Sequence, residues 1–320
     1  MILPDAEYRA LTESAGWLDL SRRGRLCLLG ADREKFLHGQ VTNDILKLRT
    51  GQGTCAALVN AKGRIESDLF VYKLADELLL DFEPGLTEKI AERLEHYVIA
   101  EDVQIVDVSP HFGLLSLQGP ASVPIAQKAG FEIPSERLSW VQSGEIYVIK
   151  NSRLGSGGFD FFVPVEALPE VVSRLESSGA LRINEAAAEQ VRIEQGIPRF
   201  GIDMDETNLA PETGLERYAI SYAKGCYIGQ EIIARVRTYG QVAKALRVLR
   251  MAGDGPCPAK GARLFHEGKE VGVVTSFTAS PKWGGRAGLG YLRKEANTLG
   301  GKVSLENGES VEVAGLPSAV

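Results

Sequence analysis

The last quarter of the chain consists of short apolar runs separated by glycines and turn residues, and no other sequence feature constrains the fold as much. The runs are Leu246–Met251, Arg263–His266, Val271–Phe277, Ala287–Leu292, Val303–Leu305 and Ser310–Val313. Short strands at close spacing, without helical periodicity between them, are typical of a small all-β barrel or sandwich. We therefore expect a C-terminal β-barrel over residues 241–320, with its boundary near 241–245.

The preceding part of the chain, residues 1–240, alternates between strand-like and helix-like segments. Strands are predicted over Leu26–Leu29, Thr54–Val59, Ile65–Leu74, Glu77–Phe82, Val103–Val108, Gly113–Leu117, Glu145–Lys150 and Phe159–Val163. Helices are predicted over Leu86–Val98 and Glu166–Ser177, after Pro120, from Asn184, and through Leu37 with Asp32 as the N-cap. Because the spacing is not that of regular βαβ units, the pattern favours an α+β body, which we expect to hold two intertwined lobes.

One predicted hairpin places a carboxylate on a defined strand face. Thr54–Val59 and Ile65–Leu74 are joined by a turn at residues 60–63. With the two-residue period of a strand, Ile65, Ser67, Leu69 and Val71 share one face, and Glu66, Asp68, Phe70 and Tyr72 share the other. Asp68 therefore lies on the polar face of its strand, where a carboxylate could simply face water or cap a turn.

Composition excludes several classes of protein. The net charge of −6 and the pI near 5.5 argue against a general nucleic-acid binder. No apolar run approaches the roughly 18–20 residues that span a bilayer, and no secretory signal is visible at the N-terminus. The four cysteines are widely spaced without CxxC pairs, which fits a reducing compartment, by default the cytoplasm, and gives no self-contained metal site.

The segment Lys224–Glu231, KGCYIGQE, brings together a cysteine, a lysine, two glycines and an amide–carboxylate pair within eight residues. Its glycines allow tight turns and close backbone approach, and a helix is expected to begin near Gly229. Lys224 and the helix N-terminus favour a thiolate at Cys226, which could serve as a nucleophile, a soft metal ligand or a redox-sensitive group. Alternatively, Cys226 is a small buried residue in a turn. None of the four histidines is near Cys226 in sequence, so a Cys–His pair could form only through the fold.

Five sequence blocks share a family resemblance. Besides Lys224–Glu231 they are Gly39–Asp44 (GQVTND), Asn60–Ile65 (NAKGRI), Ser67–Leu69 (SDL) and Arg192–Pro198 (RIEQGIP). These blocks and their order along the chain resemble those of the YgfZ family. Members of that family are folate-binding relatives of the glycine-cleavage T-protein that serve iron–sulfur enzymes. The resemblance implies a T-protein-like body with a C-terminal barrel, tetrahydrofolate or a derivative as cofactor, and iron–sulfur client enzymes, including tRNA-thiolating ones, as partners. From the net charge and the apolar runs, we expect no direct nucleic-acid partner and no membrane.

The resemblance also implies roles for single residues. Glu194 corresponds to the glutamate that anchors the pterin in T-proteins, where a carboxylate can accept two parallel hydrogen bonds. Cys226 would be the working residue, with Lys224 and Gln230 beside it in the cofactor-binding set. T-proteins have at positions 67 and 68 an Asp–Asp doublet that aminomethyl transfer to tetrahydrofolate needs, so the resemblance makes Asp68 a candidate catalytic and cofactor-binding residue. This chain has serine at position 67, so only the second carboxylate of that pair is present.

Arg235 and Arg237 are candidates for binding the glutamate tail of a folate, or they are surface charges.

Three functions remain open on the sequence alone. The missing carboxylate at position 67 counts against an aminomethyltransferase, which stays the alternative to the iron–sulfur role. A scaffold with a vestigial folate pocket is the third possibility. Whichever holds, we expect Cys226, Glu194 and Asp68 to line one cavity with the long loop at 197–217.

Overall fold

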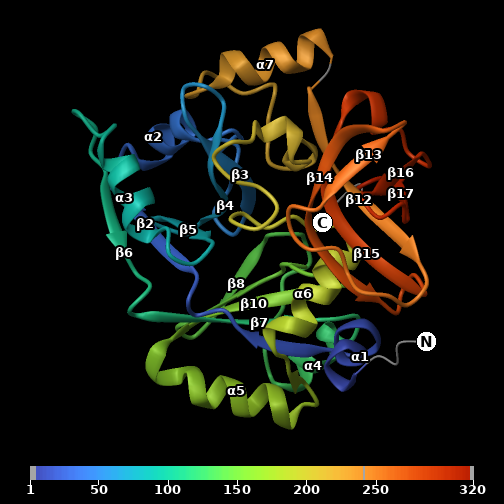
Figure 1. Cartoon of the computed structure of the whole chain (residues 1–320). Coiled ribbons are helices and arrows are strands. Elements are labelled where there is room, and N and C mark those ends of the chain that lie inside the picture. Colours follow the sequence, from blue (N-terminus) through green and yellow to red (C-terminus); the bar gives the residue numbers. More distant parts are fainter. Residues whose placement is uncertain (1–4, 241, 318–320) are drawn as a thin grey trace.

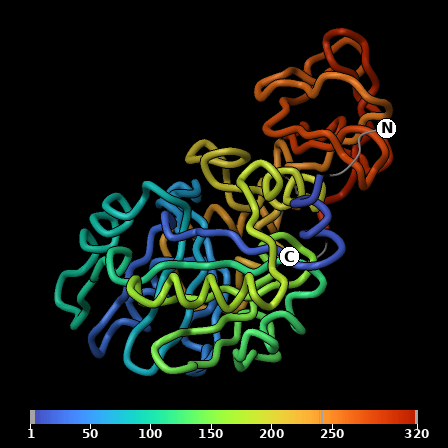
Figure 2. The backbone as a smooth tube through the Cα atoms, turned by 90° about the horizontal axis from the view of Figure 1, so that it is seen from below, coloured from blue at the N-terminus to red at the C-terminus, as the bar shows by residue number. Residues whose placement is uncertain are grey.

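The computed structural model describes residues 5–240 and 242–317, which form a two-sheet body with a β-barrel beside it (Figure 1). Seen from below, the barrel projects from one corner of the body (Figure 2). No helix in the described ranges combines the length and the apolar character that crossing a bilayer requires.

The barrel is closed by six antiparallel strands in the order β12-β15-β14-β13-β16-β17. The strands are β12 Lys244–Ala252, β13 Arg263–His266, β14 Lys269–Ser280, β15 Gly285–Arg293, β16 Lys302–Leu305 and β17 Ser310–Ala314. Closure leaves no unpaired sheet edge, and the inward side chains, such as Leu249, Leu292 and Val313, form the barrel's own core. The predicted C-terminal barrel is confirmed.

The first sheet of the body is antiparallel and has five strands in the order β3-β4-β5-β2-β6. Its elements are β2 Gly24–Leu29, β3 Gly53–Val59, β4 Ile65–Lys73, β5 Leu78–Phe82, β6 Gln104–Asp107, and the helices α2 Arg33–Gln40 and α3 Thr87–Glu95. Both helices cover one face, where Phe36 and Ile90 pack with Leu28 and Leu69. The opposite face is left to meet the second sheet.

The second sheet has six strands in the order β11-β1-β7-β10-β9-β8. Its elements are β1 Gly16–Asp19, β7 Phe112–Gln118, β8 Trp140–Ser143, β9 Ile146–Ile149, β10 Gly158–Pro164 and β11 Leu181–Arg182, with α4 Ser122–Lys128 and α5 Leu168–Ser177. These two helices cover one face. On the other face Phe162 meets Tyr72 of the first sheet, with 6.0 Å between ring centroids, so the free faces of the two sheets pack together.

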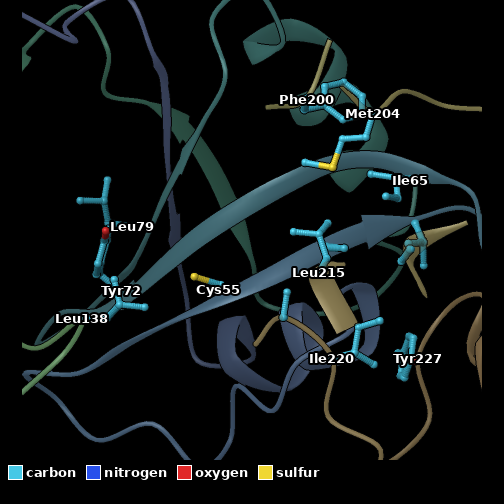
Figure 3. Packing of buried hydrophobic residues seen from close by; sticks show 14 of the residues in the cluster. Cys55, Ile65, Tyr72, Leu79, Leu138, Phe200, Met204, Leu215, Ile220 and Tyr227 are labelled. Atoms are coloured by element: carbon cyan, nitrogen blue, oxygen red, sulfur yellow. The ribbon is translucent and has the colours of Figure 1, made fainter. Parts of the chain in front are cut away.

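The remaining elements link the two sheets and the barrel. They are α1 Ala6–Glu13, α6 Glu185–Glu194, α7 Gln230–Tyr239, and the 3₁₀ helices η1 Val165–Ala167, η2 Ala210–Glu212, η3 Leu215–Arg217 and η4 Lys294–Ala296. α6 packs between α1 and barrel strands β14 and β15. The segment 197–217, predicted as a long ordered loop, contains η2 and η3. Figure 3 shows Phe200, Met204 and Leu215 of this segment around the strands that carry Cys55 and Tyr72.

Two local expectations need correction. Asp32 stands at the N-cap of α2, but its carboxylate accepts from the Asp102 backbone N–H and makes no cap. A β-bulge between Leu58 and Val59 makes Glu66 an extra residue, so Glu66 turns to Arg93 of α3, with 2.9 Å between Nε and Oε2. Sequence alternation had placed Glu66 with Asp68, but a bulge interrupts the two-residue period.

Candidate functional site

A cavity of about 540 Å³ is lined by residues from both sheets of the body. Its lining residues come from β1, β3, β4 and β7, from the segments 151–154 and 197–202, from α6 between Glu185 and Arg192, and from η3 with the residues after it. Pockets of this size suit ligands of the mass of a vitamin or drug. Of the seven site residues predicted from the sequence, only Asp68 lines this cavity.

Asp68 is the chemically distinctive group in the cavity. Its Oδ1 is buried and has no hydrogen-bond partner among the described residues. Burial, together with the Glu83 carboxylate and only partly offset by Arg23, raises the pKa of Asp68 to about 6. A buried carboxylate with a displaced pKa that faces a cavity is a typical acid–base or ligand-binding group.

The arginines deepest in the wall are already paired. Arg153 lies between two buried carboxylates, Asp81 and Asp160, with 2.8 Å between its Nε and Asp160 Oδ2, and Arg23 contacts Asp81 at 2.7 Å. Burial would raise the pKa of Asp81, but Arg153 and Arg23 outweigh it and hold that pKa below its usual value. Arg153 also stacks on Phe70, 4.8 Å from the ring centroid. The guanidinium groups of Arg153 and Arg23 are therefore already bound to carboxylates of the protein.

Two cavity-lining arginines are different. Among residues 5–240 and 242–317, no carboxylate lies within ion-pair distance of Arg22 or Arg137. Arg137 lies over the Tyr218 ring at 5.8 Å, and its Nη2 is 3.8 Å from the buried Cys55 Sγ. Both arginines are exposed side chains, so the cavity opens toward uncompensated positive charge. Sequence reasoning missed both, because neither is part of a motif.

Glu194 is not in the cavity. Its carboxylate accepts from the Tyr8 hydroxyl at 2.7 Å, from the Ser280 hydroxyl, and from the Lys282 backbone N–H at 3.2 Å. These donors come from α1, from the last residue of barrel strand β14 and from the turn that follows it, so Glu194 ties the body to the barrel. Five residues earlier on α6, Glu189 does line the cavity, but Arg192 and Arg199 already pair with its oxygens.

The KGCYIGQE segment also lies outside the cavity. The Lys224 ammonium donates to three backbone carbonyls, those of His38, Val41 and Asn43, and burial lowers the pKa of Lys224 to about 8. Four residues on, the Ile228 N–H donates to the Gly39 carbonyl at 3.1 Å. Lys224 is therefore a structural anchor, and the Cys226 side chain between these anchors is exposed.

The second glycine of this segment, Gly229, lies close to the backbone of the β3–β4 turn. Gly229 has φ +79°, and a Cβ there would lie 2.4 Å from the Asn60 carbonyl oxygen in the β3–β4 turn. The close contact seats α7 on the outer end of the hairpin, at the top of Figure 1. Gln230, the first residue of α7, therefore does not reach the cavity.

The two arginines of α7 do not reach the cavity either. Arg235 pairs with Glu231 at 2.6 Å on the exposed face, and the Arg237 guanidinium lies 4.1 Å from the centre of the Tyr222 ring. The expectation that Cys226, Glu194 and Asp68 share one cavity is therefore wrong. Among the described residues, no group of three or more His, Cys, Asp and Glu side chains is arranged to hold a metal ion.

Two family models match the chain. The model of the GCVT N-terminal domain matches residues 3–224, and that of the glycine cleavage T-protein C-terminal barrel domain matches residues 244–317. A putative chloroplast transferase of Arabidopsis thaliana is 31% identical over 310 residues, covering 95% of this chain and 70% of the relative. An aminomethyltransferase of Rubrobacter xylanophilus is 29% identical, covering 91% and 79% of the two chains.

The same architecture occurs in a solved structure. The crystal structure of the glycine cleavage system aminomethyltransferase T from Bartonella henselae superposes with a TM-score of 0.89 at 22% identity, covering 98% of this chain and 88% of the other. At this identity the similarity establishes a shared fold: a T-protein-like body followed by a C-terminal barrel.

Proposed function

Since the chain belongs to the glycine cleavage T-protein family, we propose that its cavity binds a reduced folate and supports transfer of a one-carbon unit beside Asp68. The observation that carries this proposal is the buried, unpaired Oδ1 of Asp68 in a cavity of suitable size. Relatives named aminomethyltransferase favour this function over the iron–sulfur role that the sequence blocks imply. The aminomethyltransferase alternative is thus the better supported of the two.

Position 67 does not weaken the proposal. Ser67 is fully buried, on the face of β4 opposite to Asp68, and its hydroxyl donates to the Asp68 carbonyl. A carboxylate at this position would enter the packed core under α2 and α3, away from the cavity. The serine therefore leaves the acid group of the cavity, Asp68, in place.

The cavity residues fit the chemistry of a reduced folate. Such a cofactor supplies a ring nitrogen that carries the one-carbon unit. Asp68 Oδ1 can accept a hydrogen bond from an N–H of the bound molecule, or hold a proton when the pH falls toward 6. Phe70 and Tyr218 offer aromatic faces to a flat ring, and Arg22 and Arg137 can receive the carboxylates of the tail.

Calorimetric titration with tetrahydrofolate and folinic acid tests this proposal. We expect saturable binding to the wild type, and at least about tenfold weaker binding to Asp68→Asn, because the amide replaces an acceptor by a donor. Arg235→Gln, which changes a charge on α7 outside the cavity, is the matched control and should bind normally. Absence of binding to the wild type at millimolar folate would overturn the proposal and favour the vestigial-pocket scaffold.

A transfer assay then separates an enzyme from a binding protein. Production of methylene-tetrahydrofolate from an aminomethyl donor, lost in Asp68→Asn, would support transferase activity. Folate binding without transfer would favour a non-catalytic folate-dependent role.

A second candidate is assistance to iron–sulfur enzymes, as the sequence blocks imply, in a reducing compartment such as the cytoplasm. The observation that favours it is the exposed Cys226 thiol, held outside the cavity by Lys224 and Ile228. In cells that lack this protein, Cys226→Ser should fail to restore iron–sulfur-dependent tRNA thiolation, while Cys257→Ser, at the other exposed cysteine, should restore it. Full restoration by Cys226→Ser would remove this role.

A further inference from the structure

Glu83 lines the same cavity as Asp68 and follows the adjacent strand of the first sheet. Where β4 pairs with β5, Phe70 lies opposite Asp81. Asp68 comes two residues before Phe70 on β4. Glu83 comes two residues after Asp81, just beyond the end of β5. Because side chains alternate between the two faces of a sheet, Asp68 and Glu83 project from the same face, at the same end of this antiparallel pair.

The two carboxylates differ in their partners. Arg23 donates to Glu83 Oε1, and Arg199 Nε lies 3.1 Å from Glu83 Oε2. Both oxygens of Glu83 therefore accept from guanidinium groups, which leaves neither of them free for a proton. Asp68 Oδ1, in contrast, is buried and has no hydrogen-bond partner among the described residues. The pair thus combines a fixed negative charge with a carboxyl group that can exchange a proton.

Glu83 is the charged group that acts most strongly on Asp68. Burial is the largest cause that raises the pKa of Asp68 to about 6, and the charge of Glu83 is the next. Arg23 opposes the rise, but its Nε contacts Asp81 Oδ1 at 2.7 Å and its Nη1 contacts Glu83. Because Arg23 is divided between two other carboxylates, it offsets the effect of Glu83 only in part.

The other titratable groups near Asp68 stay neutral at pH 7. Burial raises the pKa of the Cys55 thiol to about 12, against the effect of Arg137 and with a contribution from Asp68. Burial also raises the pKa of Tyr218, and Cys55 and Asp68 add to this rise. Arg137 lies beside both groups as a permanent cation. Of Asp68, Cys55 and Tyr218, only Asp68 therefore titrates between pH 5 and 7.

We propose, on the basis of the folate site proposed above, that Glu83 is a positioning residue for the one-carbon chemistry and acts through Asp68. The fixed charge of Glu83 disfavours a second charge beside it, so Asp68 Oδ1 can take up the proton of an N–H group of the bound molecule and release it afterwards. Arg23 and Arg199 hold Glu83 in place and keep it from taking that proton itself. Only a proton moves, so the step consumes no oxidant or reductant.

Glu189 provides a matched comparison for Glu83. It lines the same cavity, and its Oε1 lies 2.5 Å from Nη1 of Arg199, the same guanidinium that holds Glu83. Glu189 is not among the main groups that shift the pKa of Asp68. If the role of Glu83 were only to hold Arg199, removing the charge of either glutamate would have the same effect on the cavity.

The first test follows the titration of Asp68 by NMR of side-chain carboxyl carbons, in full-length protein without ligand, with Asp68→Asn to assign the signal. In Glu83→Gln the midpoint should fall by about one pH unit or more, because a like charge is removed. Glutamine keeps the size and one acceptor, and Glu83→Asp, which keeps the charge, should restore most of the difference. Glu189→Gln should leave the midpoint unchanged. An unchanged midpoint in Glu83→Gln, or equal shifts in Glu83→Gln and Glu189→Gln, would overturn the proposal.

The second test measures folinic acid affinity by calorimetry at pH 7.5 and pH 5 in the same variants. Between these pH values the wild type should lose about fivefold more affinity than Glu83→Gln, because Asp68 of the variant stays charged to lower pH. Titration of the ligand itself is common to all variants and cancels in this comparison. Equal pH dependence in all variants would contradict the role of Glu83. Absence of binding to the wild type would overturn the folate site, whereas the effect of Glu83 on the Asp68 midpoint stands or falls by the first test.

Discussion

The Glu194 carboxylate accepts a hydrogen bond from the Tyr8 hydroxyl, with 2.7 Å between Tyr8 Oη and Glu194 Oε2, and this contact joins the first helix to the end of α6. The other carboxylate oxygen accepts from the end of strand β14. A residue expected to hold the pterin thus holds the barrel and α1 against the body. Glu194 is not among the residues that line the cavity.

Glu194→Gln should therefore lower stability without changing folate affinity. The amide keeps its size but loses one acceptor, which should reduce the free energy of unfolding by about 1–3 kcal/mol. Urea unfolding and calorimetric titration of the same preparation check both halves of this prediction. Tyr8→Phe, which removes the partner hydroxyl, should show a smaller loss of the same kind. A large drop in affinity with unchanged stability would return Glu194 to the binding site.

Asp68→Asn should make the protein more stable at neutral pH while impairing binding. The pKa of Asp68 is raised from 3.8 to about 6, so the folded state is penalised for holding the charged form. The penalty is absent below about pH 4, grows between pH 4 and 6, and is complete above pH 6. We expect the variant to gain about 1–3 kcal/mol in unfolding free energy at pH 7.5, and little at pH 4.

Asp81→Asn is the matched control for Asp68→Asn and should act in the opposite direction. Asp81 is also fully buried, but Arg23 and Arg153 pair with it and lower its pKa. Removing its charge leaves two buried arginines short of a partner, which should cost about 3–5 kcal/mol. Urea unfolding of both variants at pH 7.5 and pH 4 measures this difference. A gain in stability for Asp81→Asn at pH 7.5, like that expected for Asp68→Asn, would contradict the prediction.

Arg22→Gln and Arg137→Gln should weaken binding of folates with several glutamates more than binding of the monoglutamate. Both side chains are exposed and line the cavity without carboxylate partners in the described ranges, so each should cost about two- to fivefold in affinity. The loss should shrink at high salt, because exposed charges are screened. Titration at two salt concentrations, with Arg235→Gln as the unaffected control, measures this.

Gly229→Ala should be far more damaging than Gly240→Ala. Both glycines have φ near +80°, a conformation that costs an alanine about 1–2 kcal/mol. Only at Gly229 would the new Cβ meet backbone, 2.4 Å from the Asn60 carbonyl oxygen, whereas nothing lies within 4 Å at Gly240. Urea unfolding should show a loss of at least about 3 kcal/mol for Gly229→Ala. Equal losses would mean that α7 is not seated on the hairpin in this way.

Much of the fold could be predicted because its signals are local. The barrel strands follow from short apolar runs between turns, and the side of β4 that carries Asp68 follows from the strand period. The strands β1, β8 and β11 and the helix α1 were missed, because short elements at the margin of a sheet are set by their neighbours rather than by their own periodicity.

The sequence by itself therefore determined the secondary structure of the hairpin and barrel, the relationship to the glycine-cleavage T-proteins, and the strand face that carries Asp68. Only the tertiary structure decided that Glu194 binds Tyr8, that Lys224 binds backbone carbonyls, and that His38 lies beside Gly225. The physical reason is that hydrophobic periodicity and turn chemistry act between near neighbours in the chain. Which distant side chains meet depends instead on how closely the elements pack, as where Gly229 lets α7 settle against the β3–β4 turn.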